Sequence, residues 1–321
     1  RRHDLRVPRP EDQVLVGKMK METAAGRLTV TRTKRSALVR LRGVPIPILL
    51  CGVVIVGFVL MALLADVITP ADPMKQHLAY RLSPPYWLAD EIEIDQPLYF
   101  LGSDQLGRDL LARIISGSRV SLVVGFAAVT FGGVVGTLLG MLAGYFGRNV
   151  DEAIMMFADI QLAFPFILLA IAVIAVLGPS FTNLVVLIGI SGWVTYARIA
   201  RAEVLSLKQK EFIEAIHSLG GSSWRVLFRH LLPNILPPLI VVATLDLART
   251  IILESTLSFL GLGIQPPTPS WGNMLGEGRQ YLDTAWWIAV FPGLFLMVVT
   301  LSVSRVGDWL RDVLDPTLRT G

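Results

Sequence analysis

The sequence predicts an all-α integral membrane protein with six transmembrane helices. Of its 321 residues, 53% are hydrophobic and 17% are charged, whereas soluble domains average about 45–50% apolar and about 25% charged residues. The mean hydropathy is +0.60. This composition excludes a water-soluble enzyme of this length. It also excludes a disordered chain, which would be poor in hydrophobic residues.

Six windows are long enough to cross a bilayer, since a transmembrane helix needs about 20 mainly apolar residues. The fifth window is unusual because it holds three charged side chains, whereas each of the others holds at most one. Before the second window, apolar residues at helical spacing over 106–120 predict a helix lying on the membrane surface. The six windows cover residues 44–68, 120–144, 153–177, 181–200, 235–260 and 284–304.

The distribution of lysine and arginine predicts that both termini are cytoplasmic, because these residues are retained on the inner side. Residues 1–43 hold 12 of them, and the alternate loops that follow hold most of the rest. We expect the start of the 1–43 segment to be disordered. The predicted regions are a basic cytoplasmic segment 1–43, a six-span domain 44–310 with extracytoplasmic segments 69–119 and 261–283 and a cytoplasmic loop 201–233, and a cytoplasmic tail 311–321.

The chain shows no signal for nucleotide, metal or nucleic-acid binding. None of its six lysines lies in the G-x-x-x-x-G-K-[ST] setting of a phosphate-binding loop. The single cysteine, Cys51, can form neither an intrachain disulfide nor a cysteine cluster. The basic residues follow the inside loops and do not form one exposed face, as nucleic-acid binding would require. We therefore expect no catalytic site, metal or cofactor in this chain.

A membrane-embedded hydrolase is the alternative from another class. The stretch 189–192, Gly-Ile-Ser-Gly, presents Ser191 inside the fourth window. A nucleophilic serine needs a base within hydrogen-bond reach, and the four histidines, at positions 3, 77, 217 and 230, all lie outside the windows. Small residues in a membrane helix more often allow close packing, so the hydrolase is a distant alternative.

The second window carries glycines at four-residue spacing, which place them on one face of a helix. Such a ridge of small residues lets a second helix approach closely. A moving contact during transport and a static packing contact are equally compatible with this pattern. The candidate packing residues are Gly132, Gly136, Gly140 and Gly144.

The cytoplasmic segment 211–233 predicts a helical hairpin outside the bilayer. An amphipathic helix begins at Glu211, glycines follow at 220 and 221, and serines suited to cap a second helix come next. We expect Pro233 to mark a turn into the fifth span.

This segment resembles the "EAA" loop of bacterial ATP-binding-cassette importer permeases. The family pattern is E-A-A, three residues, G, nine residues, and I-x-L-P. Glu214-Ala215, Gly220 and Leu232-Pro233 match it, whereas Ile216 replaces the second alanine and His230 stands at the isoleucine position. A histidine at that position is usual in the peptide-transport branch of the family.

Further segments narrow the resemblance to C-type permeases of the oligopeptide, dipeptide and nickel group. Residues 101–109, Leu-Gly-Ser-Asp-Gln-Leu-Gly-Arg-Asp, are similar to the sequence that precedes the second span in that group. Residues 257–273 are similar to its outside loop after span five, and residues 307–316 are similar to its tail. The resemblance extends over about residues 45–316.

The resemblance implies a type I ABC importer permease in a bacterial inner membrane. It implies a heterodimer with a sister permease, two ATPase subunits that bind ATP and Mg, and an extracytoplasmic peptide-binding protein. The substrate would be a di- or oligopeptide, with nickel or another small solute as the alternative. The 211–233 hairpin would be the coupling helix, with Glu214 as a charge contact, Ala215 permitting close approach and Gly220 making the tight turn; His230, Leu232 and Pro233 complete the candidate ATPase-coupling residues.

Three charged residues in the fifth span, Asp246, Arg249 and Glu254, are candidates for lining the translocation path, because a zwitterionic peptide would suit them. Charges in a span usually face a cavity or a partner. Asp246 and Arg249 lie three residues apart and share a helix face, so an ion pair without substrate contact is the competing interpretation. At the outer end of the sixth span, Trp286 and Trp287 are expected in an interfacial aromatic belt.

Overall fold

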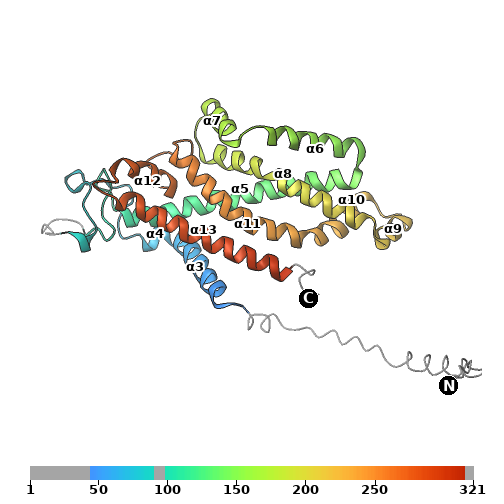
Figure 1. Ribbon diagram of the computed structural model, residues 1–321, viewed down its shortest axis with the longest axis horizontal. Helices are drawn as coiled ribbons and strands as arrows, with labels where there is room; N and C mark the ends of the chain where they lie inside the picture. Colours follow the sequence, from blue (N-terminus) through green and yellow to red (C-terminus); the bar gives the residue numbers. More distant parts are fainter. Residues whose placement is uncertain (1–43, 90–97, 315–321) are drawn as a thin grey trace, which may run out of the picture. The chain divides into compact units, whose positions relative to one another are not determined.

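The computed structural model describes residues 44–89 and 98–314, and these residues are largely helical (Figure 1). The predicted segment 1–43, residues 90–97 of the predicted extracytoplasmic segment and the tail beyond 314 lie outside the described residues. Within the described part, five helices are long and apolar enough to cross a membrane, and a bent pair of helices supplies a sixth candidate span. The prediction of an all-α protein with six spans is confirmed.

The described residues form long helices, which are the candidate spans, and short elements between them. Short elements lie between them: α4, Ala65–Ile68; η1, Leu78–Tyr80; η2, Tyr86–Leu88; α9, Glu211–Ser218; α10, Ser223–Arg225; the π-helical η3, Val226–Leu231; α12, Trp271–Gly278; and η4, Arg279–Tyr281. The long elements are α3, Ile46–Leu63; α5, Leu110–Phe146; the pair α6, Arg148–Ala163, and α7, Phe166–Leu177; α8, Phe181–Lys208; α11, Leu232–Phe259; and α13, Trp287–Leu314.

The third predicted span, 153–177, is not one straight helix. It is divided between α6 and α7, which meet at an angle of 90°. Pro165 lacks a backbone N–H and disfavours helical geometry in the residue before it. Phe164 accordingly adopts extended backbone angles, φ −96° and ψ 130°. Hydropathy identified the apolar length, but the proline determines the bend.

The helix predicted over 106–120 is helical only from Leu110 and is not a separate element. It forms the start of α5, which continues for 37 residues to Phe146. Asp109 caps its start, because the Leu111 backbone N–H donates to the Asp109 carboxylate at 3.0 Å. No break separates the entry turn from the span, so the apolar residues at helical spacing belong to the first turns of one long helix.

The predicted turn at Pro233 does not form. Residues Ser223–Phe259 run as one helical segment that qualifies as a span. A π-helical stretch precedes α11, and Pro233 lies in the first turn of α11. Proline has no N–H to donate within a helix, and the π-helical stretch directly before it is a place where the regular helical hydrogen-bond pattern is already altered. The hairpin and the fifth span are therefore mechanically continuous.

The glycine ridge of α5 lies against α8. A methyl group built at Gly132, Gly136, Gly140 or Gly144 would come within 3.0 Å of α8 atoms. The opposing carbonyls belong, in the same order, to Gly189, Trp193, Ala197 and Arg201, which also repeat every four residues. The α5 glycines thus let its backbone approach the α8 backbone closely between residues 132 and 144, because a glycine presents no side chain to the opposing carbonyl.

Candidate functional site

The 211–233 hairpin begins with α9 and turns at Gly220. Gly220 has φ +78°, a left-handed conformation that glycine adopts without strain. The Gly221 N–H donates to the Ile216 carbonyl at 2.9 Å, the six-to-one hydrogen bond of a Schellman motif. The predicted helix, glycine stop and second helix are all present.

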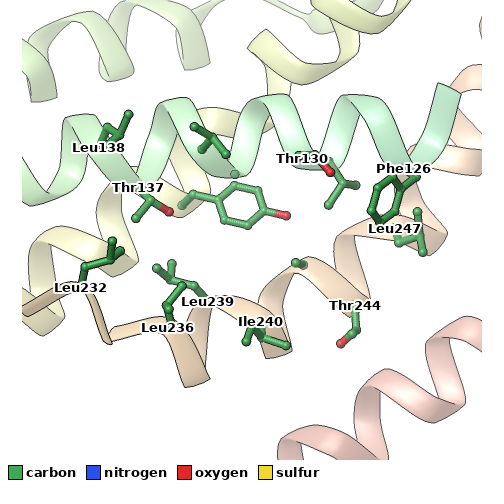
Figure 2. A pocket seen from close by; sticks show the side chains of 15 residues that line it. Phe126, Thr130, Thr137, Leu138, Leu232, Leu236, Leu239, Ile240, Thr244 and Leu247 are labelled. Carbon is green, nitrogen blue, oxygen red and sulfur yellow. The ribbon is translucent and has the colours of Figure 1, made fainter. Parts of the chain in front are cut away.

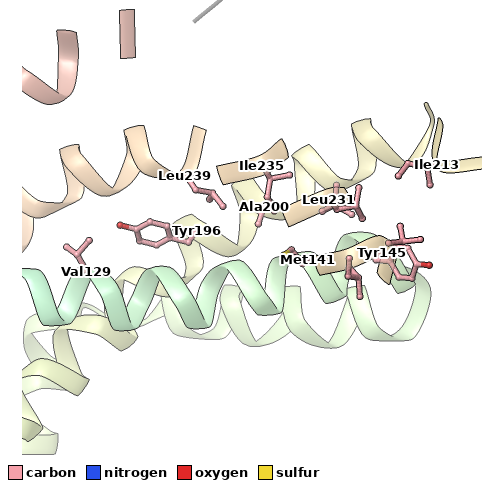
Figure 3. Close-up of a cluster of buried hydrophobic side chains, with 12 residues drawn as sticks. Val129, Met141, Tyr145, Tyr196, Ala200, Ile213, Leu231, Ile235 and Leu239 are labelled. Carbon is pink, nitrogen blue, oxygen red and sulfur yellow. The ribbon is translucent and has the colours of Figure 1, made fainter. Parts of the chain in front are cut away.

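The inner face of the hairpin packs into a buried apolar cluster (Figure 3). The cluster joins the hairpin to the end of α5, to α8 and to the start of α11 in one closely packed unit. Ile216, which departs from the family pattern, packs against this cluster, as does Leu232. The buried members from the hairpin are Ile213, Val226, Leu227 and Leu231, and they lie with Met141, Tyr145, Ala200 and Val204.

The outer face of the hairpin is exposed and partly apolar. Glu214 and Ala215 are exposed on α9. Leu219 at the tip is 88% exposed, and Trp224 is 60% exposed. The Trp224 ring stacks on Phe228, with ring centroids 5.8 Å apart. Apolar side chains gathered on an exposed face are typical of a protein contact surface.

The candidate coupling residues His230 and Pro233 do not form part of this outer tip. His230 is half-buried, and its backbone carbonyl accepts a hydrogen bond from the Asn234 side-chain amide at 2.6 Å. Pro233 is exposed on the first turn of α11. These residues lie where the hairpin joins the fifth span.

Ion pairs attach α6 to α8 near the hairpin. The Arg201 guanidinium contacts Asp151 through two hydrogen bonds of 2.5 and 2.6 Å. Arg198 contacts Asp159 at 2.6 Å. Sequence reasoning used these arginines only to orient the chain, because their acidic partners lie about 40 to 50 residues away and cannot be identified from spacing.

A groove of about 490 Å³ lies between α5 and α11 (Figure 2). Its walls are mainly aliphatic, and Tyr196 of α8 also lines it. Three threonines also line it, Thr130 and Thr137 from α5 and Thr244 from α11, but its exposed lining is almost wholly apolar, and the Thr244 hydroxyl donates to the Val241 carbonyl of its own helix.

The three charged residues of the fifth span occupy three different environments. Asp246 is half-buried and accepts a hydrogen bond from the Tyr196 hydroxyl at 3.0 Å. Arg249 is exposed, and no ion pair joins it to Asp246 in this described helix. Glu254 is fully buried and accepts hydrogen bonds from Ser258 at 2.8 Å and Ser255 at 3.2 Å. The Asp246–Arg249 pair that the spacing suggested is therefore not formed.

A buried ionic network fixes the segment before α5 to α12. Asp104 accepts hydrogen bonds from the side chains of Arg108, at 2.6 Å, and Arg113. Glu277 accepts from Arg113 at 2.8 Å and from Arg108 at 3.1 Å. Burial alone would raise the pKa of Glu277. The hydrogen bond and positive charge of Arg113 have the larger opposite effect, to which Gln105 and Arg108 add, so the pKa lies below its ordinary value.

Glu277 also gives a pH-dependent prediction. Glu277→Gln is expected to destabilise the protein by about 1–3 kcal/mol at neutral pH, because it removes a charged acceptor from buried donors. A carboxyl with a lowered folded-state pKa stabilises above its unfolded value, here 4.5, and loses that contribution as the pH falls through the folded value. In thermal unfolding, the gap between wild type and variant should stay constant from about pH 7 to 5.5 and narrow at more acidic pH. A gap that already narrows above about pH 5.5 would contradict the lowered pKa.

The serine considered for a hydrolase is part of ordinary helix packing. Its hydroxyl donates to the Ile188 carbonyl of the same helix at 2.6 Å. The neighbouring Gly189 is the point where α8 meets Gly132 of α5. This geometry supports the packing interpretation of the Gly-Ile-Ser-Gly stretch.

Two family models match the chain. Residues 136–320 match the binding-protein-dependent transport system inner membrane component. Residues 48–85 match the N-terminal transmembrane domain of oligopeptide transport permease C. The chain belongs to the binding-protein-dependent transport permeases. It is thus a multi-pass inner membrane protein and a transport component that works with ATPase subunits and a binding protein.

Relatives of this permease cover most of its length. The di/tripeptide transport permease DppC of Pseudomonas aeruginosa is 42% identical over 81% of this chain and 85% of its own. The dipeptide permease DppC of Alkalihalophilus pseudofirmus is 42% identical over 84% of this chain and 85% of its own. The glutathione permease GsiD of Pectobacterium atrosepticum is 44% identical over 69% of this chain and 74% of its own. A solved structure of the MetNI methionine ABC transporter covers 63% of this chain and 96% of its own, with 19% identity and a TM-score of 0.49.

Proposed function

We propose that this permease carries di- or oligopeptides into the cytoplasm as one half of a heterodimer with a sister permease. The energy would come from two ATPase subunits, which would bind ATP and Mg, and the permease itself would catalyse no reaction. The names of the related permeases support a peptide in preference to nickel, the alternative within this architecture. Peptides would be delivered by an extracytoplasmic binding protein.

This proposal rests on the two different faces of the 211–233 hairpin. Its outer face offers an exposed leucine and a stacked aromatic pair to a partner, while its inner face is buried against α5, α8 and α11. A partner that displaces the tip would therefore displace all three helices as a unit. ATPase closure would reach the spans through this rigid connection, as in other rigid-body transitions.

The groove between α5 and α11 is the candidate wall of the translocation path. Its exposed lining is almost wholly apolar, a surface that can contact varied peptide side chains without binding any of them tightly. Tyr196 connects this groove to Asp246. Glu254 is less suited to a direct contact with the peptide, because its carboxylate is enclosed by serines of its own helix.

Neutralising Asp246 and Arg249 together tests whether the charges of the fifth span serve the path. The variant Asp246→Asn with Arg249→Gln is expected to lower peptide uptake by roughly tenfold, which corresponds to about 1.4 kcal/mol. Uptake should be measured at equal amounts of assembled complex in vesicles. Unchanged uptake would show that these charges do not serve the path, and Ser191→Ala is a control that alters neither charge nor groove.

The function itself is tested by uptake into proteoliposomes that contain the permease, its sister subunit and the ATPases. With the binding protein outside and ATP inside, labelled dipeptide should accumulate, and it should not accumulate when ATP is replaced by a non-hydrolysable analogue. ATP-dependent accumulation of nickel without peptide accumulation would instead favour the small-solute alternative. Hydrolysis of peptides by the permease alone would contradict a purely transporting role.

A further inference from the structure

Three aromatic side chains form an exposed cluster in the segment between α4 and α5. This outer aromatic cluster consists of Tyr86, Trp87 and Phe100, whose ring centroids lie 5.3 to 5.5 Å apart. Each of the three side chains is 43% to 49% exposed, although they pack against one another. The neighbouring Leu88 and Leu98 are also exposed, at 47% and 69%. A group of exposed apolar side chains on one segment is typical of a surface that contacts a protein or a membrane.

Ring contacts connect the cluster to the first turns of α13. The Trp87 ring lies 6.2 Å from Phe291, and the Trp286 ring lies 5.8 Å from the same phenylalanine. Because α13 is a candidate span that starts at Trp287, these contacts place the cluster level with the end of the apolar part of the helix.

An exposed apolar stripe continues from the cluster along α13. Trp286, just before the helix, and residues of α13 at helical spacing are exposed: Val290, Leu294, Met297, Val298 and Leu301. The second tryptophan of the pair, Trp287, does not belong to this stripe. It is buried, and its indole N–H donates to the Ser103 carbonyl at 3.1 Å, so its expected place in an aromatic belt is wrong.

We propose that the outer aromatic cluster lies in the lipid headgroup layer and anchors the segment between α4 and α5 to the membrane surface. Two observations select lipid as the partner. The cluster is continuous with the exposed apolar face of a span, and it ends that face in Tyr and Trp, the residues whose amphipathic rings are enriched at membrane–water interfaces. The segment therefore rests on the bilayer beside α13 and presents its other surfaces to water.

A fluorescent probe at Leu88 tests this placement in the assembled transporter. In a Cys51→Ser background, Leu88→Cys is labelled with bimane and reconstituted in phosphatidylcholine vesicles that contain lipids with a headgroup nitroxide. The control is Gln76→Cys, an exposed polar position of the same extracytoplasmic segment. We expect the lipid nitroxide to quench the probe at 88 at least twofold more than the probe at 76. Water-soluble iodide should show the opposite order.

Two results would overturn the proposal. A probe at 88 that iodide quenches as well as it quenches the control would place the cluster in water. A probe that neither quencher reaches would place it under the sister permease or the binding protein. Peptide uptake by the labelled complex confirms assembly, and Leu98→Cys supplies a second position if the first variant fails to assemble.

Discussion

Replacing Gly220 by valine is expected to abolish most peptide uptake while leaving the permease inserted in the membrane. Gly220 has φ +78°, and a β-branched residue in this left-handed conformation costs at least about 1–2 kcal/mol. No atom lies within 4 Å of a side chain built at this position, so the effect comes from the backbone and not from a clash. The strained turn would redirect the hairpin tip, and a cost of this size lowers the docking-competent population by roughly 5- to 30-fold.

Matched variants separate this coupling effect from general strain. Gly220→Asn should retain most uptake, because asparagine tolerates the left-handed region. Gly261 ends α11 with φ +79°, equally open space and the same type of hydrogen bond, from the Leu262 N–H to the Leu257 carbonyl at 2.8 Å. Gly261→Val should carry similar strain without redirecting the hairpin. Equal uptake by Gly220→Val and Gly220→Asn, at equal abundance in the membrane, would refute the coupling role of the turn.

Replacing Gly140 by alanine is expected to destabilise the protein by about 1–3 kcal/mol, even though alanine is the better helix former by about 1 kcal/mol. The added methyl group would overlap the Ala197 backbone, including its Cα at 2.8 Å. Neither the added Cβ methyl group nor the Ala197 backbone can turn away by a rotamer change. The overlap is therefore relieved only if α5 moves away from α8. Gly140→Val should leave little folded protein.

Gly133→Ala is the control for this change. It lies on the same helix, but its added methyl group would make only ordinary contact with the Tyr196 ring, at 3.5 Å. Thermal unfolding in detergent should show a clear loss for Gly140→Ala and little change, or a gain, for Gly133→Ala. Equal stability of the two variants would mean that the ridge is not a close packing contact. If Gly140→Ala lowered peptide uptake without lowering stability, the contact between α5 and α8 would be one that moves during transport.

The spans and the hairpin could be predicted because their signals are local. Apolar length identifies a membrane helix, and a glycine after an amphipathic stretch identifies its end. Such local signals could not show that the chain bends at Pro165 but continues as a helix through Pro233. Both are prolines next to apolar helices, and their effects differ with the position each occupies in the hydrogen-bonding pattern.

The partners of charged residues could not be predicted, because they depend on tertiary contacts. The motif around Arg108 was apparent in the sequence, but Glu277, which completes its network, lies 169 residues further along the chain. Asp246 and Arg249 show the opposite failure, since helical spacing suggested a pair, yet Asp246 instead bonds Tyr196 of another helix. Spacing therefore indicates which residues share a face but not which atoms meet.

Site-directed cross-linking from the hairpin tip tests the central claim most directly. Leu219 is 88% exposed, so Leu219→Cys in a Cys51→Ser background can carry a photoactivatable cross-linker with little disturbance. In membranes that contain the whole transporter, the main product should join the permease to an ATPase subunit, in a yield that changes with ATP. The same reagent at Gln76→Cys should give no such product. Cross-links only to lipid, or to no ATPase in an assembled and active transporter, would contradict the account of the hairpin as the coupling element.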